Sequence, residues 1–83
     1  MSRAKCRDDV KKGTVFALGN GKRVLICTDP APASAWLRYI VEGDTSINST
    51  EFQSFVGRFD IVQYPNEETI AWADEVMQRL GGS

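Results

Sequence analysis

The dipeptide Asn20-Gly21 lies between two apolar runs, and no other feature of the sequence constrains the fold as strongly. The runs cover residues 14–18 and 23–28, and both are rich in the β-branched and apolar side chains that are typical of strands. An Asn-Gly pair between two such runs favours a two-residue type I′ turn, because both residues accept a positive φ angle. The sequence therefore predicts a β-hairpin over residues 14–28.

The chain after this hairpin alternates between strand-like and helix-like patterns. Residues 36–41 have the two-residue alternation of a strand and are followed by a turn. Ser49 is a suitable N-cap and Gly57 a suitable C-cap for a short helix over residues 50–56. Residues 58–64 again have the pattern of a strand, which a proline ends.

The last segment has the pattern of an amphipathic helix. Asn66 is its predicted N-cap, and two glutamates in the first turn complement the positive end of the helix dipole. Trp72 lies outside the predicted apolar stripe, so it is either a partner contact or a residue that widens the buried face. The predicted stripe consists of Ile70, Ala73, Met77 and Leu80.

These elements predict an α+β fold with one hydrophobic core, since the chain has 83 residues of which 42% are apolar. The order β-β-β-α-β-α, with about four strands, resembles that of an SH3-like, partly open barrel: a small, strongly bent antiparallel sheet to which a C-terminal amphipathic helix is added. We expect residues 1–12 to form a polar, basic N-terminal arm and residues 13–82 a single compact domain.

The residue types available for chemistry are few. The chain has no histidine, which is the commonest general base and transition-metal ligand, so we expect no enzyme activity, no metal and no cofactor. Cys27 lies in an apolar run and is expected to be buried, whereas Cys6 lies among cations and is either an activated thiol or an incidental exposed one. Without an export signal, we expect reduced thiols and a cytoplasmic location.

The leading functional hypothesis is a small, stand-alone, non-catalytic protein that binds a macromolecule, most readily another protein. Proteins of this size often act as adaptors, inhibitors or regulators, including those carried by phages and other mobile elements. Exposed aromatic side chains are the usual anchors of protein interfaces. The candidate contact residues are Trp72, Glu68, Trp36 and Tyr39.

Nucleic acid is the alternative partner, because the charge is unevenly distributed. Residues 1–23 hold seven basic residues against two acids, a net charge of +5, whereas residues 24–83 hold three against nine, a net charge of −6. A cluster of cations can bind phosphates, although most nucleic-acid-binding domains are basic overall and this chain has a pI of about 5.3. The candidate residues are Arg3, Lys5, Arg7, Lys11, Lys12, Lys22 and Arg23.

Overall fold

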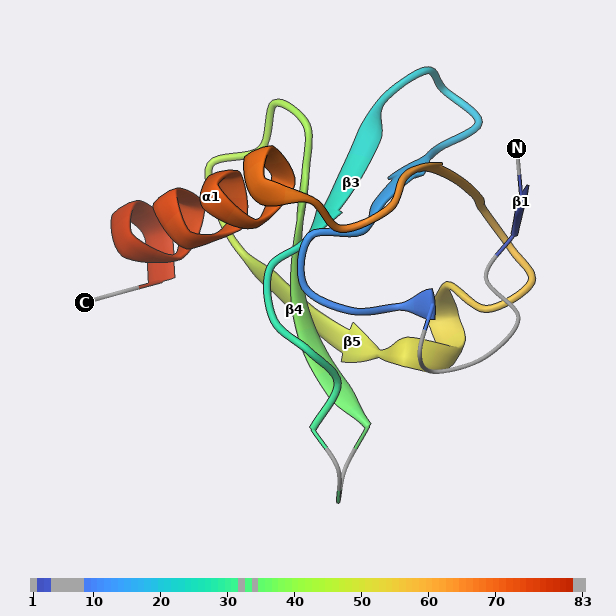
Figure 1. Ribbon diagram of the computed structural model, residues 1–83, viewed down its shortest axis with the longest axis horizontal. Helices are drawn as coiled ribbons and strands as arrows, with labels where there is room; N and C mark the ends of the chain where they lie inside the picture. The colour runs from blue at the N-terminus through green and yellow to red at the C-terminus, as the bar shows by residue number, and fades with distance from the viewer. Residues whose placement is uncertain (1, 4–8, 32, 34, 82–83) are drawn as a thin grey trace.

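The computed structural model describes residues 2–3, 9–31, 33 and 35–81, in which six strands form one antiparallel sheet that a C-terminal helix follows (Figure 1). The spatial order is β1-β6-β2-β3-β4-β5, so β1 and β5 are the edges and the sheet is not closed. The predicted α+β class is confirmed, but the element order differs from the predicted one. The elements are β1 (Ser2–Arg3), β2 (Val15–Ala17), β3 (Arg23–Ile26), β4 (Trp36–Val41), β5 (Asn48–Glu51), the 3₁₀ turn η2 (Phe52–Ser54), β6 (Asp60–Gln63), α1 (Glu67–Val76) and the π-helical turn η3 (Met77–Gly81).

The predicted hairpin is confirmed as β2–β3, but the predicted type I′ turn is wrong. The N–H of Gly21 donates to the carbonyl oxygen of Leu18 at 3.2 Å. The N–H of Leu18 donates to the carbonyl oxygen of Lys22 at 2.8 Å. Gly21 has a φ of +87°, whereas Asn20 has no positive φ. The connection is therefore a three-residue loop with one left-handed glycine, which is the next most common hairpin geometry.

The short helix predicted over residues 50–56 is wrong. Residues 48–51 form strand β5, which pairs with β4 in the register Leu37↔Thr50. Only the single turn η2 follows, and it brings Phe55 into the core. Phe52 and Phe55, whose spacing indicates a helix, lie at this single turn. A longer helix does not form, because backbone groups of residues 48–51 pair with β4 instead.

Strand β6 returns to the first hairpin and pairs with β2, with a bulge opposite the Val15–Phe16 step. On its other side β6 pairs with Ser2–Arg3 of β1. Val10 is also fully buried in the core. The described part of residues 1–12, which we expect to form an arm, therefore contributes to both the sheet and the core; residues 4–8 lie outside the description.

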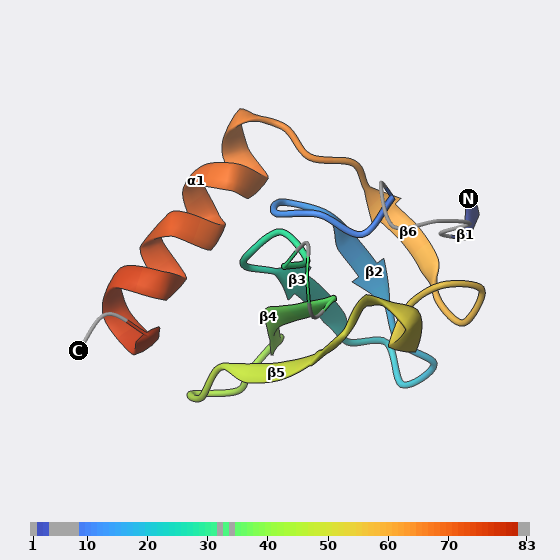
Figure 2. The same cartoon turned by 90° about the horizontal axis from the view of Figure 1, so that it is seen from below.

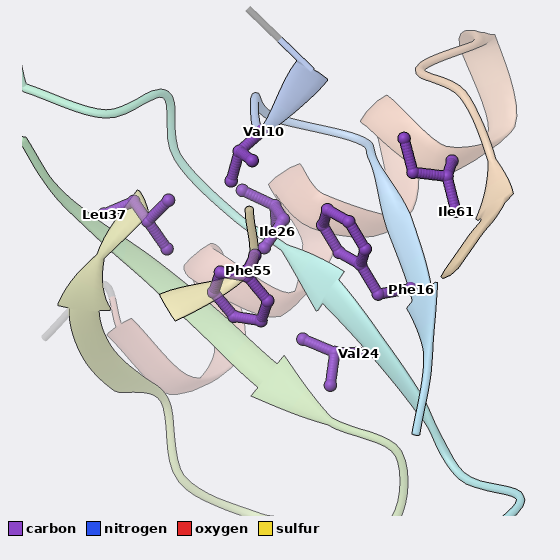
Figure 3. Packing of buried hydrophobic residues seen from close by; sticks show 7 residues of the cluster. All are labelled: Val10, Phe16, Val24, Ile26, Leu37, Phe55 and Ile61. Carbon is purple, nitrogen blue, oxygen red and sulfur yellow. The ribbon is translucent and has the colours of Figure 1, made fainter. Parts of the chain in front are cut away.

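Apolar side chains are buried on both faces of the sheet. Strand β4 contributes buried side chains to both faces, Leu37 to one and Ile40 to the other, as its alternation predicts. Figure 2 shows α1 along one side of the strands, and the buried side chains between them form the helix-side core: Val15, Leu25, Cys27, Ile40, Ala73 and Val76. The opposite face bends around the inner core, whose side chains point toward one another in Figure 3: Val10, Phe16, Val24, Ile26, Leu37, Phe55 and Ile61.

Helix α1 is confirmed, but part of its predicted core stripe is wrong. Ile70 is 38% exposed and Leu80 is 39% exposed, whereas Thr69, Ala73 and Val76 are buried. The buried stripe is thus rotated toward the side of Thr69. Leu80 lies in the π-helical turn η3, which changes the helical phase, and it borders a polar groove at the β5 edge.

Candidate binding surface

Trp36, at the start of strand β4, which lies next to the edge strand β5, is 49% exposed. It borders two open grooves. The first is lined also by Glu51, Gln53 and Arg58, together with hydroxyls of β5 and η2. The second is lined also by Asp29 and by Arg38. A large aromatic ring that borders two arginine-lined grooves has the composition of an interface hot spot.

Tyr39 lies on the opposite face of β4 and borders a third groove, of about 340 Å³, which is mostly apolar. Its ring meets that of Phe55 edge to face, with a centroid distance of 5.4 Å. The ring of Phe59 also contacts that of Phe55, with a centroid distance of 6.0 Å. Phe55 is buried in the inner core, whereas Tyr39 and Phe59 are half-buried and pack against that core.

Three residues join the apolar groove to the first groove of Trp36, since Thr50, Ser54 and Arg58 line both. The hydroxyl oxygens of Thr50 and Ser54 lie 2.9 Å apart and are hydrogen-bonded. We name this continuous region the β5 surface and define it by Trp36, Tyr39, Thr50, Ser54 and Arg58. It offers apolar area, aromatic rings, hydroxyl groups and a guanidinium group.

The other two predicted contact residues lie elsewhere. Trp72 and Glu68 line a groove with Arg23, Gln63 and Thr69, none of which belongs to the β5 surface. Trp72 is half-buried and packs against the helix-side core. The structure therefore brings Trp36 and Tyr39 to one surface and Trp72 and Glu68 to another.

The basic residues predicted for nucleic acid are spread over the fold. Lys11 and Lys12 precede β2, whereas Lys22 and Arg23 lie at the opposite end of the same hairpin. Two of the four form ion pairs, Lys12 with Asp74 and Arg23 with Glu42 at 3.0 Å. The hydrogen bond from Arg23, and then its charge, lower the pKa of the Glu42 carboxyl. Arg3 contributes its backbone to β1, and Lys5 and Arg7 lie outside the described residues.

Among the described residues, Cys27 has the largest shift in pKa. Its side chain is 1% exposed, and burial raises the pKa of the thiol from 9.0 to about 11, with a smaller opposing effect of Lys12. A thiol with so high a pKa is neutral at physiological pH and is a poor nucleophile. The prediction that Cys27 is a buried hydrophobe is confirmed, whereas Cys6 lies outside the described residues.

Sequence reasoning missed Thr50, Ser54 and Arg58. The first two fall in the segment predicted as a helix, and the third follows it, so no local pattern relates them to Trp36. The cross-strand pair Trp36↔Glu51 is what places them together. Such a contact between distant segments leaves no periodic signal in the sequence.

Among residues 2–3, 9–31, 33 and 35–81, no three histidine, cysteine, aspartate or glutamate side chains group as metal ligands would. The same residues contain no helix whose length and apolar character would let it cross a bilayer. No protein-family model, curated protein or solved structure matches this chain.

Proposed function

We propose that this protein is a small, non-catalytic binding protein whose β5 surface recognises another protein. The observation that carries the proposal is the half-exposed Trp36 beside Arg58 and the apolar groove. Tryptophan and arginine are the residues most enriched among those that dominate binding energy. The groove of Trp36 and the apolar groove share lining residues, and apolar surface gathered in one region is typical of an interaction site.

The proposal includes an SH3-like relationship for the sheet. Strands β2, β3, β4 and β5 follow one another as a meander, η2 follows them, and β6 returns to pair with β2. A 3₁₀ turn before a last strand that returns to the first supports this relationship. Topology alone would not assign a function, so the argument for binding depends on the β5 surface.

A working location in the cytoplasm is part of the same proposal. It is supported by the buried free thiol of Cys27, since free thiols persist in a reducing compartment.

Nucleic-acid binding has less support from the described residues. The cations that precede β2 and those that follow the hairpin loop point to no common surface, and Lys12 and Arg23 are already paired with carboxylates. A phosphate backbone would have to displace those carboxylates. Such binding would fall steeply with salt, because each neutralised phosphate releases counterions.

The test is affinity capture from cells of the native host with three baits: the wild-type chain, Trp36→Ala and Tyr64→Ala. Tyr64 is the matched control, because it is 57% exposed and lines none of the grooves described above. We expect one protein to be recovered by the wild type and by Tyr64→Ala, but not by Trp36→Ala, with and without nuclease.

Two outcomes would contradict the proposal. Recovery that depends on intact nucleic acid would move the function to the alternative class. Recovery of the same protein by all three baits would remove the β5 surface as the binding site. Circular dichroism and a thermal melt of each bait show that a loss of binding is not a loss of fold.

A further inference from the structure

The outer edge of β5 has no strand beside it within the part of the chain that the structure describes, because β5 is the last strand in the sheet order. The strand covers Asn48–Glu51 and is polar, with one charged residue. An edge strand presents unpaired N–H and C=O groups and can pair with another extended chain.

The backbone groups that face this edge can be identified from the neighbouring strands. The carbonyl oxygen of Arg38 accepts from the N–H of Cys27 at 2.8 Å, and the N–H of Arg38 donates to Thr28 Oγ1 at 2.9 Å, so both groups of Arg38 face β3. The edge faced by backbone groups alternates along an antiparallel strand, so Leu37 and Tyr39 face β5 instead.

This alternation determines which residues of β5 face outward. Leu37 is opposite Thr50, and Tyr39 is opposite Asn48, so the groups of Thr50 and Asn48 face β4. The groups of Ser49 and Glu51 therefore face the free edge. The N–H of Phe52 donates to the carbonyl oxygen of Ala35 at 3.0 Å, which agrees with this alternation.

The side chains beside the edge differ between the two faces of the sheet. On the face of α1, Ser49 is opposite Arg38 and Glu51 is opposite Trp36. On the inner face, Thr50 borders the apolar groove that Arg58 also lines. A chain added to this edge would place alternate side chains on the two faces, toward Trp36 on one and toward the apolar groove on the other.

The charges on this surface favour an acidic occupant. Neither Arg38 nor Arg58 forms an ion pair within the described chain. Two acids lie nearby, but the Asp29 carboxylate already accepts from the N–H of Lys12 at 2.9 Å, and Glu51 is the single acid of the strand itself. A second copy of this chain would add only one carboxylate through its own β5, that of Glu51, and would bring its own Arg38 and Arg58 to the same edge, so a partner strand that carries more carboxylates is the better complement.

We propose that β5 accepts an extended peptide segment of the partner protein as an additional antiparallel or parallel strand. The segment carries apolar side chains at alternate positions and acidic side chains beside them. This proposal rests on the proposed function and deepens it, because main-chain hydrogen bonds to Ser49 and Glu51 supply register and the two faces supply selectivity. About four to six residues of peptide match the four residues of β5.

The test uses a displayed library of random ten-residue peptides and the pair Ser49→Pro and Ser49→Ala. Proline removes the outward N–H of Ser49 and is tolerated on an edge, whereas alanine keeps that N–H. We expect peptides enriched on the wild type to alternate apolar and acidic residues. They should bind Ser49→Ala with unchanged affinity and Ser49→Pro about tenfold more weakly, which is the upper end of the effect of losing one hydrogen bond.

A second measurement keeps the proposal falsifiable if Ser49→Pro does not fold. A selected peptide is N-methylated at alternate positions in two versions. The version methylated at residues whose backbone N–H groups face β5 should lose binding. The version methylated at the intervening residues, whose N–H groups point away from β5, should keep it. Equal binding of both versions, or a library with no enriched peptide, would overturn the strand addition.

Two other results separate this proposal from its competitors. Sedimentation equilibrium that shows a dimer of the wild type, lost in Ser49→Pro, would assign the edge to a second copy and overturn the peptide proposal. A partner that requires Trp36 but binds Ser49→Pro normally would leave the proposed function intact and overturn only the strand addition. A partner insensitive to both variants would overturn both.

Discussion

Gly13 allows a test of how closely the N-terminal turn approaches helix α1. Its φ is +95°, and a Cβ atom there would lie 2.9 Å from Ile70 Cγ1, 3.1 Å from Thr69 Oγ1 and 3.3 Å from the Cα atom of Pro65. The turn is closed by a hydrogen bond of 3.0 Å from the N–H of Thr14 to the carbonyl oxygen of Lys11. Gly13→Ala therefore introduces both backbone strain and a steric conflict.

Gly21 separates the two effects, because its φ is +87° and nothing lies within 4 Å of its Cβ position. Gly21→Ala should cost only the strain of a left-handed alanine, about 1–2 kcal/mol. Gly13→Ala should cost that amount and about 1–3 kcal/mol more for overpacking. Ile70 can move, because it is partly exposed, but Thr69 is held by the hydrogen bond that its Oγ1 accepts from the N–H of Asn66 at 2.9 Å.

The assay is urea denaturation of both alanine variants, together with Ile70→Ala and the double variant Gly13→Ala/Ile70→Ala. Removing the Ile70 side chain should restore about 0.5–1.5 kcal/mol of the loss, as a positive coupling between contacting residues. Equal losses for Gly13→Ala and Gly21→Ala would refute the close approach. So would a double variant whose loss equals the sum of the losses of Gly13→Ala and Ile70→Ala.

Four further variants test the burial of particular side chains. The raised pKa of Cys27 contributes about 2–3 kcal/mol to the free energy of unfolding, which is fully present below pH 9 and is lost as the pH rises from 9 to about 11. Urea denaturation of Cys27→Ala across that range should not show this loss. Leu80→Ala should cost less than about 1 kcal/mol and Val76→Ala about 2 kcal/mol, because only Val76 is buried; the reverse order in thermal melts would refute the helix phase. Trp72→Ala should lower the free energy of unfolding by roughly 2 kcal/mol.

Features with a local cause were predictable from the sequence. Asn66 caps α1 as predicted, because its Oδ1 accepts from the N–H of Glu68 at 2.9 Å and from that of Thr69 at 3.0 Å, all within four residues. The Asn20-Gly21 loop was likewise predictable in position. Its length was not, because one left-handed residue or two can close such a loop, and the strands decide which.

Strand β5 could not be predicted for the opposite reason. Asn48, Ser49 and Thr50 have no apolar alternation, and they form a strand because β4 offers its backbone groups there. The candidate surface has the same origin. Trp36 was selected as an aromatic residue, but Arg58 is recruited by the path of the chain through η2, which no local pattern specifies.

Trp72 shows how a small error in helical phase changes a functional interpretation. The predicted stripe through Ile70 leaves Trp72 outside the core, whereas the observed stripe through Thr69, Ala73 and Val76 brings it to the margin of the helix-side core. A fully buried tryptophan would cost roughly 3–5 kcal/mol on truncation, so a half-buried one should cost less, about 2 kcal/mol.

Trp36→Ala is the matched control for this prediction, because it removes the same side chain from a site that is 49% exposed and outside both cores. We expect it to lower the melting temperature less than Trp72→Ala does, while it alone abolishes partner capture. If Trp72→Ala left the melting temperature unchanged and abolished capture, the helix groove with Glu68 and Arg23 would replace the β5 surface as the binding site. The two tryptophans thus have opposite expected effects on stability and on binding, and one pair of variants measured in both assays decides which surface the partner uses.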